Sequence, residues 1–261
     1  MKKILSIAVL FVALTTQLGA QTLHSIIFAN KEEQGRTADR TEEFNNMRAF
    51  CKELANALGY SHDLRTHSGS EFTTAQMISD IDGLTVNEDD IIILYYCGHG
   101  ANLSGGYWPH MALSDRAYNS NTAYERLKSK CVNAKLVLCI AACCNKEVEN
   151  RSSYSTSASS GTTMNRSRVK QLFTGFDGKM NIMMSSSVKG QYSYSLSGGM
   201  RLGPIFTMSL RDVIYESVEN GSPRPLDWNS LLSTVKERTD SWARSVVGKS
   251  QLPQYQIEYK N

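Results

Sequence analysis

The sequence lacks a basic block, the paired cysteine spacings of metal sites, and any long apolar run beyond its amino terminus. Positive and negative residues are mixed along the chain and the formal net charge is only +3, so nucleic acid is not expected as a partner. The 6 cysteines include no CxxC pair and no cysteine–histidine spacing that fits zinc. Because the chain is long enough to bury a proper core, neither a metal site nor a disulfide scaffold is expected.

The one long apolar run lies at the amino terminus. Two lysines precede an apolar stretch at 4–14, and the small residues Gly19 and Ala20 follow it. This order of basic, apolar and small residues is typical of a secretory signal peptide, and the stretch is shorter than the ~20 residues of a membrane-spanning helix. We therefore expect residues 1–20 to be removed, with a cut after Gln21 as the alternative. The mature chain, with no membrane span, would then be periplasmic or secreted.

Strand-like and helix-like segments alternate along the rest of the chain. Apolar runs predict buried strands at 24–30, 90–100, 135–142 and 179–187, with further extended segments at 62–66 and 251–258. Apolar residues recur at helical spacing at 39–60, 73–81, 121–129, 203–218 and 228–246. Such alternation predicts an α/β fold with a mostly parallel sheet that helices cover on both faces. Ligands and chemistry in such sheets lie at the carboxyl ends of the strands.

One segment, 150–168, departs from this alternation. It consists mostly of serine, threonine and basic residues and contains almost nothing apolar, so we interpret it as a mobile loop. We expect one domain over residues 21–261, in which a linker at about 150–170 separates a larger part (about 21–149) from a smaller part (about 171–261).

Two reactive motifs end two neighbouring predicted strands. His99, flanked by glycines, ends the first, and Cys143 and Cys144 end the second. One predicted helix separates the strands, so the motifs are expected to be close in space. A nearby imidazole can lower the pKa of a thiol below its free value of about 8.5 and so generate a nucleophile. The backbone N–H of Gly100 is a candidate donor to an oxyanion. Taken alone, each motif is more often a plain turn histidine or a small buried cysteine, and it is their joint placement at two strand ends that favours a role in chemistry.

In this order, the two motifs resemble the caspase–metacaspase superfamily of cysteine peptidases. In that family one strand ends in a small residue and Gly-His-Gly, and a later strand ends in Asp-x-Cys. The corresponding residues here are 97–100 (CGHG) and 142–144 (ACC), and the resemblance continues at 112–115, 184–210 and 251–255. It implies a caspase-like fold and an endopeptidase that hydrolyses peptide bonds with a Cys–His dyad, with a peptide or protein as substrate. With the expected signal peptide, the enzyme would be exported.

The resemblance also assigns roles to individual residues. Cys144 corresponds to the nucleophile and His99 to the general base, with Cys143 as the alternative nucleophile if the register shifts by one. The substrate groove would be shaped by residues that follow the later strand, Ser185, Ser186 and Gln191. The plain alternative for this second group is a serine-rich turn.

One departure from the family bears on specificity. The acidic residue two positions before the nucleophile is Ala142 here, and a second acidic position, after the first strand, is Asn30. In relatives that cut after Arg or Lys, such carboxylates hold the basic side chain. A basic preference is therefore not expected unless nearby acids substitute, namely Glu32, Glu33 or Asp39. The same loss is compatible with a catalytically inactive caspase-fold protein that binds peptides or proteins.

The resemblance implies no redox or organic cofactor. Calcium activates some relatives, but no acidic cluster in this sequence demands it. Family members are often cut between their two parts, and the candidate positions here are Arg151, Arg166, Arg168 and Lys170. A third functional alternative is an acyl-transfer hydrolase that uses the same Cys–His pair on a non-peptide amide or ester. The oligomeric state is not defined by the sequence.

Overall fold

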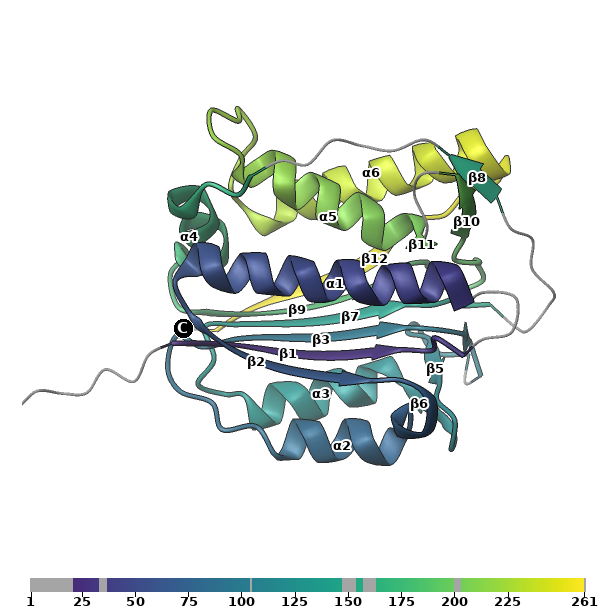
Figure 1. The fold of residues 1–261 in the computed structure, drawn as a ribbon, viewed down its shortest axis with the longest axis horizontal. Coiled ribbons are helices and arrows are strands. Elements are labelled where there is room, and N and C mark those ends of the chain that lie inside the picture. Colours follow the sequence, from purple (N-terminus) through teal and green to yellow (C-terminus); the bar gives the residue numbers. More distant parts are fainter. Residues whose placement is uncertain are drawn as a thin grey trace, which may run out of the picture.

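The computed structural model describes residues 21–32, 37–103, 105–146, 154–156, 163–199 and 203–260. The expected signal peptide, Glu33, Arg151 and about half of the expected linker lie outside these residues. A six-stranded sheet in the order β12-β9-β7-β3-β1-β2 lies between two layers of helices (Figure 1). Its strands are β1 (Thr22–Ala29), β2 (Ser61–His67), β3 (Ile91–Cys97), β7 (Leu136–Ala142), β9 (Lys179–Ser185) and β12 (Gln254–Lys260).

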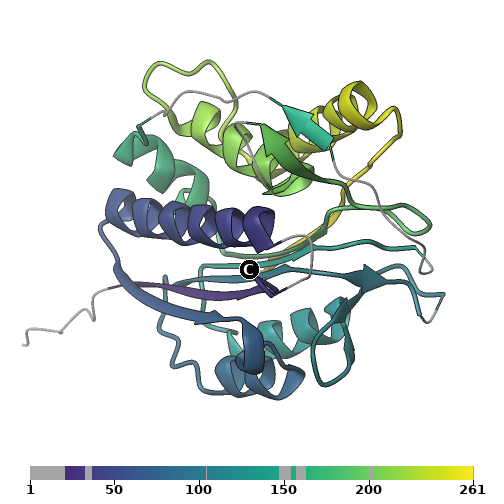
Figure 2. The ribbon, with the colours of Figure 1, turned by 45° about the vertical axis from the view of Figure 1, so that its right-hand side comes forward.

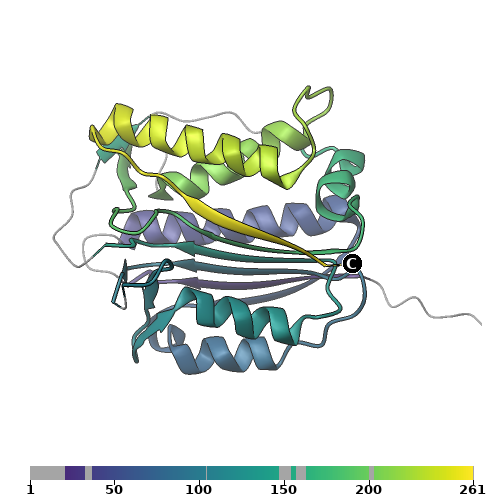
Figure 3. The same cartoon turned by 180° about the vertical axis from the view of Figure 1, so that it is seen from behind.

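The first five of these strands are parallel, and β12 pairs antiparallel with β9 at one edge. Seen from behind, β12 lies along this edge, antiparallel to its one neighbour, β9 (Figure 3). Every residue of β3 and β7 is buried, which explains why both read as unbroken apolar runs rather than as alternating patterns. The predicted α/β class and mostly parallel sheet are confirmed.

Helices cover both faces of the sheet, as predicted. On one face lie α1 (Thr37–Leu58), α4 (Arg166–Thr174), α5 (Ile205–Val218) and α6 (Trp228–Val247), and on the other lie α2 (Thr74–Asp82) and α3 (Ser120–Lys130) (Figure 1). Because side chains alternate across a strand, each central strand contributes to both cores. None of the helices in the described part of the chain is long and apolar enough to cross a membrane.

Two small sheets lie at the end of the molecule toward which the parallel strands run (Figures 1 and 2). One consists of β4 (Gly100–Ala101), β5 (His110–Ala112) and β6 (Ala117–Asn119). The other consists of β8 (Tyr154–Thr156), β10 (Ser195–Gly199) and β11 (Gly203–Pro204). Since β4 directly follows the predicted His turn, these sheets flank the end of the sheet where the two motifs lie.

Helix α4 corrects the predicted linker. The expected loop ended at 168 and the linker at about 170, but the helix begins at Arg166. Asn165 caps it by accepting a hydrogen bond from the Arg168 N–H at 3.1 Å, and its apolar residues pack into the core. The candidate cut sites Arg166, Arg168 and Lys170 therefore lie in a helix rather than in a loop. The Arg168 guanidinium further donates to the Ser217 and Arg224 carbonyls.

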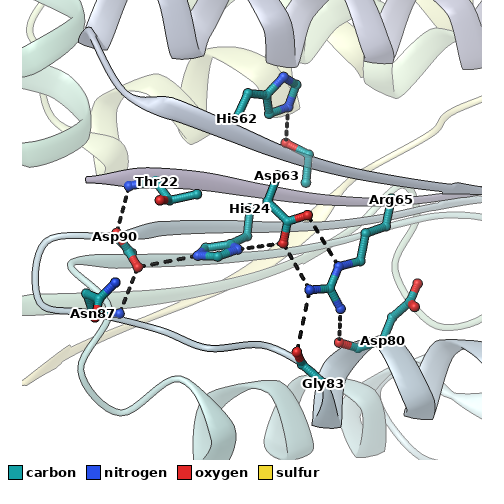
Figure 4. A network of polar contacts seen from close by, with 10 residues as sticks. Thr22, His24, His62, Asp63, Arg65, Asp80, Gly83, Asn87 and Asp90 are labelled. Carbon is teal, nitrogen blue, oxygen red and sulfur yellow. Dashed lines mark hydrogen bonds and ion pairs between the residues drawn. The ribbon is translucent and has the colours of Figure 1, made fainter. Parts of the chain in front are cut away.

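A polar network joins β1, β2 and the turn just before β3 near the opposite end of the sheet (Figure 4). His24 lies between two carboxylates, 2.9 Å from Asp63 and 3.3 Å from Asp90. Arg65 donates to Asp63, and Asp90 accepts from the Asn87 backbone N–H at 2.7 Å. Burial alone would raise the pKa of Asp63, but the hydrogen bonds from His24 and Arg65 outweigh it and hold that pKa below its usual value. This network fixes strand register and lies away from the two motifs.

Candidate active site

The register of the sheet brings the two motifs to the same edge. β3 and β7 are adjacent and parallel, and Cys97 pairs with Ala142. His99 and Cys144 each lie two residues beyond this pair. The expectation that the motifs are neighbours in space is confirmed at the level of the strands that carry them.

A tyrosine beneath the His99 turn determines its shape. The Tyr96 hydroxyl donates to the His99 carbonyl at 2.6 Å and contacts the Ala112 carbonyl at 3.0 Å, and the Ala112 N–H donates to the same His99 carbonyl at 3.0 Å. The His99 side chain is left exposed. A Cβ on Gly98 would lie 2.5 Å from the Tyr96 hydroxyl oxygen, so only glycine fits above this tyrosine.

Gly100, on the other side of His99, packs directly on the segment that carries the two cysteines. A Cβ there would lie 2.5 Å from the Cys143 Sγ and 2.8 Å from the Cys144 carbonyl oxygen. Glycine at this position therefore lets the histidine turn and the cysteine segment approach to backbone contact. A side chain is therefore excluded at each glycine by a different neighbour: Tyr96 below the turn at Gly98, and the cysteine segment beside it at Gly100.

Cys143 and Cys144 have different surroundings. Cys143 belongs to the apolar cluster that faces α2 and α3, together with Cys139 from the same strand. The Cys144 sulfur instead accepts a hydrogen bond from the Ser193 backbone N–H at 3.0 Å and lies 3.6 Å from the Ser193 carbonyl oxygen. The Cys144 thiol meets polar backbone groups from the 191–195 segment, although its residue is only 2% exposed.

Other thiols of the chain are unsuited to nucleophilic chemistry. All six cysteines are free and buried. Burial raises the pKa of Cys51 to about 11 and those of Cys131 and Cys139 to about 12. A thiol must ionise to attack, so these three are inert near neutral pH. Among the described residues, no cluster of three or more histidine, cysteine or carboxylate side chains could hold a metal ion.

The residues expected to shape the groove support the cysteine segment instead. Ser185 and Ser186 are fully buried, and the Ser186 hydroxyl donates to the Cys143 carbonyl at 2.7 Å. The Gln191 side-chain oxygen accepts from the Leu252 N–H at 2.8 Å. Neither serine reaches the surface in this structure. The sequence of 184–187 contains mostly serine, and a serine pattern does not show whether its side chains are buried or exposed.

Two residues near the cysteine segment escaped the sequence analysis. Ser193 contacts the Cys144 sulfur through its backbone, and no side-chain pattern signals a backbone contact. Gln251 is fully buried, accepts from the Tyr194 N–H at 2.9 Å and donates to the Ser186 carbonyl at 2.9 Å. It lies in the 251–255 stretch that carried part of the family resemblance, which was the available signal. Gln251 thereby ties the 191–195 segment to the strand end beside Cys143.

The position that is acidic in some relatives is apolar here, and a cation lies close to it. Ala142 is buried beside Cys97, and the Arg40 guanidinium of α1 donates to the Cys97 sulfur at 3.0 Å. Asn30 uses its backbone N–H to donate to the Cys97 carbonyl at 3.1 Å. Asp39, a possible acidic substitute, is buried on the same helix as Arg40.

Together, the strand order, the helices on both faces and the two motifs at adjacent strand ends define a caspase-like α/β protein. The chain matches the caspase domain over residues 23–259 and belongs to that family. Caspase-1 from Spodoptera frugiperda has a similar fold, with a TM-score of 0.54 and 15% identity over 91% of this chain and 86% of that one. A Geobacter sulfurreducens protein is similar at a TM-score of 0.53 and 16% identity, over 92% and 94% of the two chains. No protein of curated function matches this chain.

Proposed function

We propose that this protein is a cysteine endopeptidase in which Cys144 is the nucleophile and His99 the general base. The observation that carries the proposal is the register between β3 and β7. Cys97 pairs with Ala142, and His99 and Cys144 each follow that pair by two residues. Cys144 is chosen over Cys143 because it lies two residues beyond Ala142, as His99 lies two residues beyond Cys97, and its sulfur accepts a hydrogen bond from the Ser193 backbone N–H.

In the proposed reaction, the His99 imidazole accepts the proton of the Cys144 thiol. The thiolate attacks the carbonyl carbon of the peptide bond, a C–S bond forms, and the oxyanion receives a hydrogen bond from the Gly100 backbone N–H. The imidazolium donates its proton to the leaving amine as the C–N bond breaks. Water, deprotonated by His99, then hydrolyses the thioester, which releases the acid and restores the thiol. None of these steps needs a metal or an organic cofactor.

We do not expect the pocket for the residue before the cut to prefer lysine or arginine. The two positions that carry carboxylates in relatives with that preference are Ala142 and Asn30 here, so a basic side chain would be held only if the buried Asp39 takes their place. Cleavage of a peptide library in which this residue is varied would test the preference directly.

Cleavage of fluorescein-labelled casein by the mature chain, residues 21–261, tests the proposal. We expect Cys144→Ala and His99→Ala each to lower the cleavage rate by about 100-fold or more. Cys139→Ala, a buried thiol on the same strand, is the matched control and should retain the wild-type rate. Activity that survives Cys144→Ala and disappears in Cys143→Ala would move the nucleophile by one residue. Wild-type protein that cleaves neither casein nor the library would instead indicate a caspase-fold binding protein.

Export is a separate proposal that rests on residues 1–20. Expression of the full chain with its amino terminus, followed by sequencing of the protein outside the cytoplasm, should find a mature chain that begins at Gln21 or Thr22. Retention of residues 1–20 on the exported or cytoplasmic protein would contradict it.

A further inference from the structure

The residue after the proposed nucleophile is an asparagine that no solvent reaches. Asn145 is 0% exposed although its side chain carries two donors and an acceptor. A buried amide is costly unless its hydrogen bonds are made, so its partners show what holds it there. They come from two segments that are distant from each other in the sequence.

The side chain of Asn145 is bonded on both of its polar atoms. Its amide nitrogen donates to the Tyr107 carbonyl at 2.9 Å and faces the Ser187 carbonyl at 3.4 Å. Its oxygen accepts from the Asn102 amide nitrogen at 2.8 Å. The backbone of Asn145 adds two more bonds, donating to the Gln191 carbonyl at 3.1 Å and accepting from the Gly190 N–H at 2.7 Å.

Asn102 brings the histidine side of the site into this network. It lies three residues after His99, and its residue is 8% exposed. Its amide nitrogen donates to Asn145 and also to the Gly106 carbonyl at 2.8 Å, and its backbone N–H donates to the Lys146 carbonyl at 3.3 Å. The His99 segment and the Cys144 segment are therefore joined by both a side-chain pair and a backbone bond.

The chemistry of the pair explains why both residues are amides. Two carbonyl oxygens face the Asn145 nitrogen, so a carboxylate there would place oxygen against oxygen. Asn102 uses its nitrogen twice, which neither a carboxylate nor an aliphatic side chain of that size can do. An apolar pair would fill the same space without fixing the distance between the two segments.

We propose that Asn145 and Asn102 are positioning residues that set the His99 turn against the Cys144 segment. This proposal rests on the proposed Cys–His function. Neither residue acts on substrate. A displacement of about 1 Å between reacting groups lowers a rate by about 100-fold, so a fixed spacer between base and nucleophile affects the reaction even when the fold survives its loss.

The test is the rate at which iodoacetamide alkylates Cys144, located by peptide mapping and measured against pH. We expect His99→Ala to slow alkylation at neutral pH by about 10-fold or more. Asn145→Ala and Asn102→Ala should each slow alkylation by nearly as much as His99→Ala does. The dependence of their rates on pH should also move toward that of His99→Ala. In the His99→Ala background, adding Asn145→Ala should change the rate no further, because the two residues act through one interaction.

Asn181→Ala is the matched control, since Asn181 is a buried asparagine on β9 outside this network. It should lower thermal stability without changing the alkylation rate. Two results would overturn the positioning role alone. One is an alkylation rate that Asn145→Ala lowers by the same factor in the wild type and in His99→Ala, and the other is a wild-type alkylation rate in both asparagine variants. If wild-type alkylation is itself independent of His99, the proposed peptidase function fails, and the positioning proposal falls with it.

Discussion

A single methyl group added at Gly100 should damage the site more than it damages the fold. The Cβ of Gly100→Ala would lie 2.5 Å from the Cys143 Sγ, 2.6 Å from the Cys143 Cβ and 2.8 Å from the Cys144 carbonyl oxygen. Ordinary contacts between such atoms begin at about 3.5 Å. The histidine turn and the cysteine segment must therefore separate by up to about 1 Å.

The two costs of this change differ in size. Overpacking of this kind destabilises a protein by about 1–3 kcal/mol, which a domain with about 5–15 kcal/mol of stability survives. The same displacement falls between the proposed base and nucleophile, where about 1 Å lowers a rate by about 100-fold. We therefore expect Gly100→Ala to remain folded and to lose about 100-fold in casein cleavage.

The assay combines casein cleavage with urea unfolding, and a second substitution supplies the control. Cys143→Gly removes two of the three close contacts, so the Gly100→Ala methyl should cost less stability and less activity in that background than in the wild type. Activity of Gly100→Ala within about 3-fold of wild type would refute the reasoning. So would an equal loss in both backgrounds.

Three further predictions concern stability, each measured by urea unfolding. Arg211→Met removes the ion-pair partner of the fully buried Glu43 carboxylate, which keeps only a hydrogen bond from the Tyr95 hydroxyl, and should cost about 3–5 kcal/mol. A loss below about 1 kcal/mol, the size expected for a surface ion pair, would contradict the burial argument. Hydrogen bonds from Arg238 hold the pKa of Glu216 in the folded protein below its usual 4.5. Ionised Glu216 therefore stabilises the fold fully above its pKa in the unfolded chain, and this contribution is lost as the pH falls through its pKa in the folded protein. Glu216→Gln should therefore flatten the pH dependence of stability below pH 4.5, and an unchanged slope would oppose this. Thr73→Ala removes the side chain that caps α2 and should lower the free energy of unfolding by about 1 kcal/mol. An unchanged free energy of unfolding would show that this hydrogen bond does not stabilise the helix.

The sheet and most of its helices could be predicted because they follow from burial alone. β3 and β7 are buried on both faces, and their unbroken apolar runs carry that information. Helix α4 was missed because its buried residues, Val169, Leu172 and Phe173, follow directly on a serine-rich and basic stretch. Composition averaged over 150–168 concealed a helix that begins with a capping asparagine.

The site was predictable only where its chemistry requires a particular side chain. The adjacent ends of β3 and β7 follow from order along the chain, so the placement of His99 and Cys144 could be anticipated. Ser186 was expected to shape a groove, but it is buried and donates its hydroxyl to the Cys143 carbonyl. A serine hydroxyl can bond to a buried carbonyl or to a substrate, and the sequence does not distinguish the two. Asn145 carried no signal, since its role depends on partners brought together by folding.

The central claim is that His99 activates Cys144, and one labelling experiment tests it most directly. The mature chain is treated with a sub-stoichiometric peptide-like electrophile near neutral pH, and peptide mapping finds which of the six cysteines carries the label. The account predicts fast labelling at Cys144 in the wild type and its collapse in His99→Ala. Slow labelling spread over several cysteines, with the same pattern in His99→Ala, would contradict it and would favour a protein that binds peptides without cutting them.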